Sequence, residues 1–302
     1  MMNQGWTYCD RITQKSANVT LLDYYTQRYH HSTRQQWQGR IEAGQVRING
    51  QPARPNTLLE AGQKLTYHRS PWQEPAAPLD FHICYQDSDI WVVNKPSGLP
   101  VLPGANFLEH TLLWQVRQQD STAYPVHRLG RGTSGLVLFA RTPVARAHLS
   151  QQMRSHQVTK TYRAIVGGTT IPAEFTIDQP IGRCPHPTLG YVYGAVDDTD
   201  SDGLWAKSQG QVRQYMDDRT EVKVTITTGR PHQIRIHLAA LGHPLLGDPL
   251  YSVGGRPRPD AVPGDCGYFL HAWQLSFRQP TTGKQLTIQQ DPPWDSDAHL
   301  RS

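Results

Sequence analysis

The sequence predicts an α+β protein in which a small basic domain precedes a larger domain with a mixed, largely antiparallel sheet. The 302 residues are enough for one large domain and a smaller one. A proline-rich segment at 70–80, SPWQEPAAPLD, is typical of a stiff linker and separates two patterns of helices and strands. Beyond it, strands and helices follow one another without regular βαβ alternation. We therefore expect domains at 1–75 and 76–302.

The first domain is expected to hold two helices followed by two strands. Apolar and aromatic residues recur at helical spacing over 20–31 and over 34–43, and a glycine then ends the second helix. Short apolar runs at 46–48 and 65–68 predict strands, and an Asn-Gly turn follows the first of them.

The larger domain is expected to mix seven strands with three helices. Runs of β-forming residues predict strands at 81–86, 89–95, 136–141, 159–167, 221–228, 273–278 and 284–289. Helical spacing predicts helices at 109–119, 143–154 and 231–241. The polar stretch at 196–203 predicts a surface loop.

Positive charge is concentrated in the first domain. Residues 1–75 hold nine Lys and Arg against five Asp and Glu, so this part carries +4 of the chain's net charge of +5. A basic module attached to a nearly neutral one suggests a polyanionic partner such as a nucleic acid. A solvated positive face without a partner explains the charge equally well.

Several classes of protein do not fit this sequence. No run of 18 apolar residues could span a membrane, and the N-terminus has no apolar signal region, so we expect a cytoplasmic protein. We also expect it to be a monomer. The four cysteines form no C-x-x-C pair, which disfavours zinc, redox and disulfide roles. His232 and His237 lie five residues apart and do not share a helical face, so we expect no metal site.

The stretch HRLGRGTSGLVLFA at 127–140 satisfies the pattern G-x-G-x-x-G of dinucleotide-binding loops. That loop must open a helix, whereas here the apolar run at 136–141 predicts a strand. The pattern G-x-S-x-G of a nucleophile elbow also fails, because Leu136 stands where its last glycine should be.

Three clusters combine polar, cationic and aromatic residues with tight backbone. They are the turn with His127, Arg128 and Arg131, the segment KTY at 160–162, and TGRPHQIRIH at 228–237. Such groups suit an anionic, aromatic ligand such as a nucleotide in RNA. For Tyr162 alone, packing on an alternating strand is the commoner role.

Five segments in order resemble the motifs of the RluA-type RNA pseudouridine synthases. The resemblance spans roughly residues 81–295 and rests on NKPSGLPVLPG at 94–104, HRLGRGTSGLVLFAR at 127–141, KTYRAIVGG at 160–168, TGRPHQIRIHLAALGHPLLGDPLY at 228–251 and LHAWQLSFRQPTTGK at 270–284. GRIEAGQVRINGQ at 39–51 is similar to the small RNA-binding domain named after ribosomal protein S-four.

The resemblance implies a cofactor-free isomerase that flips a uridine out of folded RNA and rejoins its base through carbon. In the family an aspartate of H-R-L-D acts on the sugar, a tyrosine of K-x-Y stacks on the base, and an arginine of R-x-H-Q-I-R pairs with the aspartate. Here the tyrosine is Tyr162, the arginine is Arg235, and Gly130 stands in place of the aspartate. The implied RNA-binding residues are His127, Arg128, Arg131, Thr133 and Ser134 in the second motif and Arg34, Arg40 and Arg47 in the basic domain.

A glycine cannot attack or deprotonate a sugar, so the family mechanism cannot run unchanged at Gly130. An unpaired Arg235 in a partly buried pocket would cost about 3–5 kcal/mol, so a partner is expected. It is either an RNA phosphate or another carboxylate, for which Asp248, Asp89 and Asp120 are the candidates, although a turn or helix-cap role is the commoner one for Asp248. Two functions remain open. One is an active synthase acting on ribosomal or transfer RNA, and the other is an inactive RNA-binding protein or RNA-folding helper.

Overall fold

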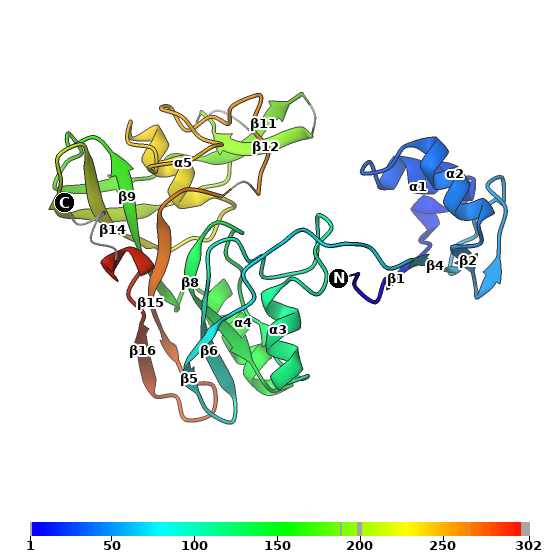
Figure 1. Cartoon of the computed structure of the whole chain (residues 1–302), viewed down its shortest axis with the longest axis horizontal. Helices are drawn as coiled ribbons and strands as arrows, with labels where there is room; N and C mark the ends of the chain where they lie inside the picture. The colour runs from blue at the N-terminus through cyan, green and yellow to red at the C-terminus, as the bar shows by residue number, and fades with distance from the viewer. Residues whose placement is uncertain (1, 188, 198–200, 265, 297–302) are drawn as a thin grey trace. The chain divides into compact units, whose positions relative to one another are not determined.

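A computed structural model describes residues 2–187, 189–197, 201–264 and 266–296 (Figure 1). The chain divides into two compact units, Met1–Glu74 and Pro75–Ser302, one residue from the boundary expected from the linker. Residues 198–200 of the expected loop at 196–203 lie outside the described part. Among the described residues, no helix is both long and apolar enough to cross a membrane.

The first unit packs two helices with a four-stranded sheet. Thr20 and Thr33 accept hydrogen bonds from backbone amides three residues on, and so begin α1 (Leu21–Arg28) and α2 (Arg34–Glu42). The predicted helices are confirmed, although the first ends at Arg28 rather than 31. The sheet order is β1-β4-β2-β3, with β1 (Trp6–Arg11), β2 (Val46–Ile48), β3 (Gln51–Pro52) and β4 (Lys64–Arg69), and a short 3₁₀ turn, η1 (Gln14–Ser16), follows β1.

The second unit is built on a ten-stranded sheet. The sheet is mixed and largely antiparallel, as predicted, but has more strands than the seven expected. The main path runs β10-β13-β14-β9-β15-β8-β6-β5, and β16 and β7 pair with β15 and β8. The bounds of these strands are β5 His82–Gln86, β6 Ile90–Lys95, β7 Tyr124–Pro125, β8 Ser134–Ala140, β9 Thr159–Gly167, β10 Glu174–Ile177, β13 Ser208–Tyr215, β14 Arg219–Ile226, β15 Leu270–Arg278 and β16 Gln285–Gln289.

The helices and a separate hairpin complete this unit. The helices are α3 (Leu112–Gln119), α4 (Pro143–Arg154) and α5 (Gln233–Ala240), and η2 (Pro293–Ser296) is a 3₁₀ turn. The hairpin is formed by β11 (Ile181–His186) and β12 (Gly190–Ala195). All three helices were predicted, whereas β10 to β13, which hold few uninterrupted apolar runs, were not.

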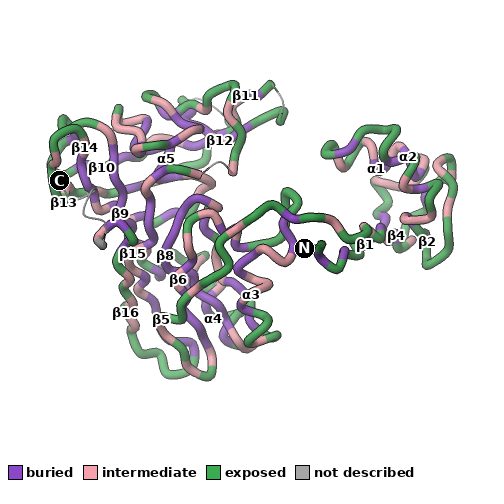
Figure 2. The backbone as a smooth tube through the Cα atoms, in the orientation of Figure 1, coloured by how far each residue is buried: buried purple, intermediate pink, exposed green. Residues whose placement is uncertain are grey.

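The central strands are buried along most of their length (Figure 2). The glycine-rich turn leads directly into β8, all of whose residues are buried, so it is not a dinucleotide loop. β8 runs parallel to β15, with Ser134 opposite His271, and β9 runs antiparallel on the other side of β15. Gly135 is required here, because its φ is +105° and a Cβ would lie 2.4 Å from the Ala272 carbonyl oxygen.

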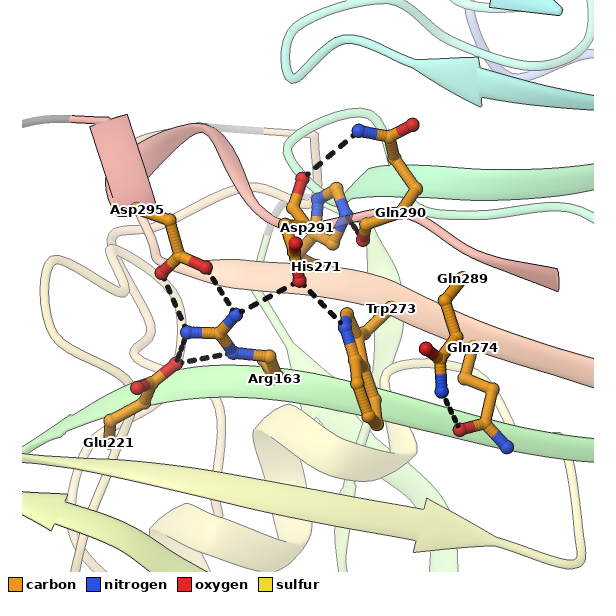
Figure 3. Close-up of polar contacts among 9 residues, drawn as sticks. All are labelled: Arg163, Glu221, His271, Trp273, Gln274, Gln289, Gln290, Asp291 and Asp295. Atoms are coloured by element: carbon orange, nitrogen blue, oxygen red, sulfur yellow. Dashed lines mark hydrogen bonds and ion pairs between the residues drawn. The ribbon is translucent and has the colours of Figure 1, made fainter. Parts of the chain in front are cut away.

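Arg163, next to Tyr162 on β9, holds a buried ion-pair cluster (Figure 3). Its Nε lies 2.6 Å from Glu221 Oε1 on β14, and its Nη2 lies 2.7 Å from Asp295 Oδ1 on η2. Its Nη1 lies 3.5 Å from the exposed Asp291. The cluster therefore fixes the chain after β16 against the middle of the sheet.

The variant Glu221→Gln should lower the free energy of unfolding by about 1–3 kcal/mol, because a charge-assisted hydrogen bond in a buried site becomes a neutral one. Denaturant unfolding measures this loss. Asp291→Asn is the matched control and should cost less than about 1 kcal/mol, because that side chain is 72% exposed. Equal losses in the two variants would contradict the importance of the buried pair.

Candidate active site

A cavity of about 320 Å³ lies where the glycine-rich turn, β9, β15 and the start of α5 meet. All three polar clusters of the sequence contribute to it, although they are far apart in the chain. Its lining residues are His127, Arg128, Leu129, Gly130, Thr133, Lys160, Tyr162, Ile226, Gly229, Arg230, His232, Gln233, Ile234, Arg235, Tyr268 and Leu270.

The glycine-rich turn is held in place by the segment that follows β6. The fully buried Lys95 Nζ donates hydrogen bonds to the carbonyl oxygens of Leu99 and Arg131, at 2.7 and 3.1 Å. Ser97 Oγ donates to the carbonyl oxygen of Gly132 at 2.7 Å. Burial lowers the pKa of Lys95 to about 7. These contacts brace the turn, and the role of Lys95 in them was not among the predictions from the sequence.

His127 enters the cavity as a neutral ring. Its Nε2 accepts a hydrogen bond from the backbone amide of Leu138 at 3.1 Å, which requires a free lone pair on that nitrogen. Burial lowers the pKa of His127 to about 3, in agreement with this contact. His127 therefore supplies shape and a hydrogen-bonding edge but no positive charge near neutral pH.

Tyr162 and Lys160 lie two residues apart on β9 and both line the cavity. Tyr162 is 7% exposed, and burial raises the pKa of its hydroxyl above the ordinary value, so the group is protonated. Burial also lowers the pKa of Lys160. An aromatic ring beside an amine suits a nucleotide, whose planar base can stack on the ring while its phosphate faces the amine.

Arg235 is paired with Asp248, one of the three carboxylates expected as candidates. Its Nε and Nη2 lie 2.8 and 2.7 Å from the two oxygens of Asp248, in a bidentate pair with both side chains buried. The other two candidates are wrong. Asp120 pairs with Arg141, and Asp89 accepts hydrogen bonds from Gln279 and Thr281.

Asp248 also shapes the turn that follows it. Its Oδ1 accepts hydrogen bonds from the backbone amides of Leu250 and Tyr251, at 2.8 and 3.1 Å, so it is a turn residue as well as an ion-pair partner. Both carboxylate oxygens are thus occupied, and Asp248 does not line the cavity. It neutralises Arg235 but is poorly placed to act on a substrate.

His232 begins α5 with left-handed backbone, at φ 53°. Its Nδ1 lies 2.8 Å from the Tyr251 hydroxyl, which donates its own proton to the Tyr193 carbonyl oxygen at 2.6 Å. The phenol must therefore accept from Nδ1, and Nε2 keeps a free lone pair. Burial and, to a smaller extent, Arg235 lower the pKa of His232 to about 4.

Four cations face the cavity, and one of them, Arg235, is paired with Asp248, which does not line it. Arg128, Arg230, Lys160 and Arg235 line it, and no Asp or Glu does so in the part of the chain that the structure describes. The cavity can therefore bind an anionic, aromatic group, but it offers no carboxylate to act on a sugar.

The remaining predicted residues lie at different places. Gly130 and Thr133 line the cavity, whereas Ser134 bonds to His271 inside the sheet, and Arg131 Nε lies 3.3 Å from Cys266 Sγ. In the first unit, the exposed Arg34 pairs with Asp23, and Arg47 is exposed on β2. The guanidinium carbon of Arg40 lies 4.7 Å from the centre of the Trp37 ring. Tyr268, two residues before the last motif, lines the cavity without any sequence signal.

Comparisons with known proteins agree on one family. The sequence model of a family described as RNA pseudouridylate synthase matches residues 89–240. An uncharacterized RNA pseudouridine synthase of Synechocystis sp. is 49% identical over 272 residues, which make up 89% of this chain and 92% of that protein. The ribosomal large subunit pseudouridine synthase D of Vibrio parahaemolyticus is 33% identical over an aligned length of 273 residues, and the match covers 83% of this chain and 81% of that protein.

A solved structure agrees as well. Human RNA pseudouridylate synthase domain containing 1 has a TM-score of 0.58 and 26% identity, and the match covers 74% of this chain and 87% of that chain. These matches confirm the resemblance carried by the five motifs. The chain belongs to the RNA pseudouridylate synthases, a family of isomerases that act on RNA.

Proposed function

We propose that this protein isomerises one uridine of a structured ribosomal or transfer RNA to pseudouridine in the cavity between β9, β15 and α5. The observation that carries the proposal is the convergence of Tyr162, Arg235 and three further cations on one cavity. The base of a flipped uridine would lie against Tyr162, and the phosphates on either side of that nucleotide would face Arg128 and Arg230. The likeness to a protein named for the large ribosomal subunit favours ribosomal RNA.

Tyr162 would contact the base of the uridine, and Arg235 would provide a positive charge to the nucleotide. Tyr162, protonated and almost fully buried, offers a ring for stacking and a hydroxyl that can donate to the base. Arg235, fixed by Asp248, presents a positively charged group of fixed direction to the nucleotide. Both side chains are buried, which strengthens these two interactions.

A site-resolved pseudouridine map of total host RNA, with and without this gene, tests the proposal. We expect one site to vanish on deletion, to return with the wild-type gene, and to stay absent with Tyr162→Phe. Purified Tyr162→Phe should bind the RNA within a few-fold of wild type, because only one hydroxyl is lost. Arg235→Ala is the poorer test, because it would leave Asp248 buried without its partner.

A second function is favoured by one observation, the lack of a carboxylate on the described lining of the cavity. A catalytically inactive RNA-binding protein or RNA-folding helper would keep the cations and the stacking tyrosine without needing an acid. An unchanged pseudouridine map under conditions in which the protein is expressed, together with tight RNA binding, would favour this second function.

We further propose that the first unit binds RNA through its exposed arginines. Arg34 and Arg47 are both exposed, so Arg34→Gln/Arg47→Gln should weaken RNA binding with little change in folding. The slope of log K against log salt should become shallower by up to about 2, since each lost phosphate contact removes about 0.7–0.9. Arg278→Gln, exposed at the other end of β15 from the cavity, is the control. Equal slopes in all three proteins would contradict a role for these arginines.

A further inference from the structure

Tyr268 fills the space that the missing side chain at position 130 leaves open. A Cβ added to Gly130 would lie 3.2 Å from the Tyr268 hydroxyl oxygen. A Cβ added to Gly132 would lie 2.9 Å from two atoms of the same ring and 3.1 Å from its hydroxyl. The two glycines and the phenol are therefore complementary in shape, and the hydroxyl oxygen is in near contact with the point at which a side chain at 130 would begin.

The Tyr268 hydroxyl lies in the cavity and has polar and cationic neighbours, as a catalytic group does. Tyr268 lines the same cavity as Tyr162 and is only 6% exposed. The Arg235 guanidinium carbon lies 4.2 Å from the centre of its ring, and its hydroxyl oxygen lies 3.2 Å from Thr133 Oγ1. Burial raises the pKa of Tyr268, and Arg235 acts in the opposite direction.

We propose that the Tyr268 hydroxyl is the catalytic group that acts on the sugar of the flipped uridine, in place of a carboxylate at position 130. This inference rests on the proposed isomerase function. A tyrosine oxygen can serve at an anomeric carbon, as the tyrosine nucleophile of sialidases shows. The positive charge of Arg235, held over the face of the Tyr268 ring, stabilises negative charge that develops on the phenol.

The chemical steps balance without a further reactant. In the first, the phenol oxygen forms a bond to C1′ of the ribose, the bond from C1′ to N1 breaks, and the phenolic proton moves to the uracil. The uracil then turns within the cavity. In the second, C5 bonds to C1′, the bond from C1′ to the phenol oxygen breaks, and the proton on C5 leaves to restore the hydroxyl. The net reaction converts uridine to pseudouridine.

Tyr268→Phe is the sharpest test, because it removes only the hydroxyl oxygen. The aromatic ring keeps its contacts with Gly132 and Arg235. The probe is total RNA from a host strain that lacks this gene, and the single-turnover rate is measured at the site that wild-type protein modifies. We expect the rate to fall at least about a hundredfold. RNA affinity and the midpoint of unfolding should stay within a few-fold and a few degrees. Tyr124→Phe, the same change on an exposed tyrosine outside the cavity, should leave all three unchanged.

The possible results separate this inference from the function on which it rests. Product at the wild-type rate with Tyr268→Phe would overturn the role of Tyr268 and leave the isomerase function standing. A fall in rate matched by an equal fall in RNA affinity would also overturn it, because Tyr268 would then serve binding alone. No product with the wild-type protein would overturn the isomerase function and this inference with it.

Discussion

Asp248→Ala should lower the free energy of unfolding by about 3–5 kcal/mol, because it leaves Arg235 buried and unpaired. It also removes the acceptor for the backbone amides of Leu250 and Tyr251. Denaturant unfolding of the full chain measures the loss. We expect RNA isomerisation to fall as well, because Arg235 loses the partner that fixes its direction.

Two further variants separate the charge of Asp248 from its role in the turn. Asp248→Asn keeps an oxygen for the two amides and should be less damaging than Asp248→Ala. Arg235→Met/Asp248→Asn removes both charges and should recover much of the lost stability, since a buried ion pair is often replaceable by an apolar one. A loss below about 1 kcal/mol for Asp248→Ala would contradict the energetic importance of the pair.

Gly130→Asp should restore isomerisation to the Tyr268→Phe variant by at least about tenfold. The backbone at Gly130 is not left-handed, so an aspartate is allowed there. The atom closest to its Cβ is the Tyr268 hydroxyl oxygen, which phenylalanine lacks, so the carboxylate gains room in the cavity that Arg235 also lines. Single-turnover rates on the RNA site of the wild-type protein measure the rescue.

Gly132→Asp in the same Tyr268→Phe background is the matched control. A Cβ at 132 would lie 2.9 Å from Cε1 and Cζ of the ring, and phenylalanine keeps both atoms, so this carboxylate is not accommodated. We expect no rescue. Equal rates in the two double variants would mean that a carboxylate at 130 has no special place in the site.

The sequence predicted the elements of the site better than their contacts. The motif on β9 and the motif on α5 correctly identified Tyr162 and Arg235 as residues that share a cavity. Matching a motif did not suffice for Ser134 and Arg131. Ser134 begins a strand buried on both faces and bonds to His271, and Arg131 points toward Cys266. Neighbouring residues of a turn or strand point to different sides, so one pattern includes both kinds.

The carboxylate partner of Arg235 shows the same limit. The sequence offered Asp248, Asp89 and Asp120 as candidates. It could not distinguish them, because all three are aspartates in expected turns or loops and the sequence does not say which of these lies next to Arg235. The choice depends on where the chain after α5 returns, and this places Asp248 alone against the guanidinium. The strands from β10 to β13 were missed for a related reason, since their stability comes from pairing with β14 and with one another rather than from their own apolar runs.

The sequence by itself determined the family, the fold class, the strand that follows the glycine-rich turn, and the absence of a side chain at position 130. These depend on residue identity and local backbone preference, which are written along the chain. Only the tertiary structure decided that Asp248 holds Arg235 and that Tyr268 occupies the space over Gly130. Both contacts join residues brought together by the packing of β8, β9, β15 and α5, and such packing depends on the shapes of side chains distant in sequence.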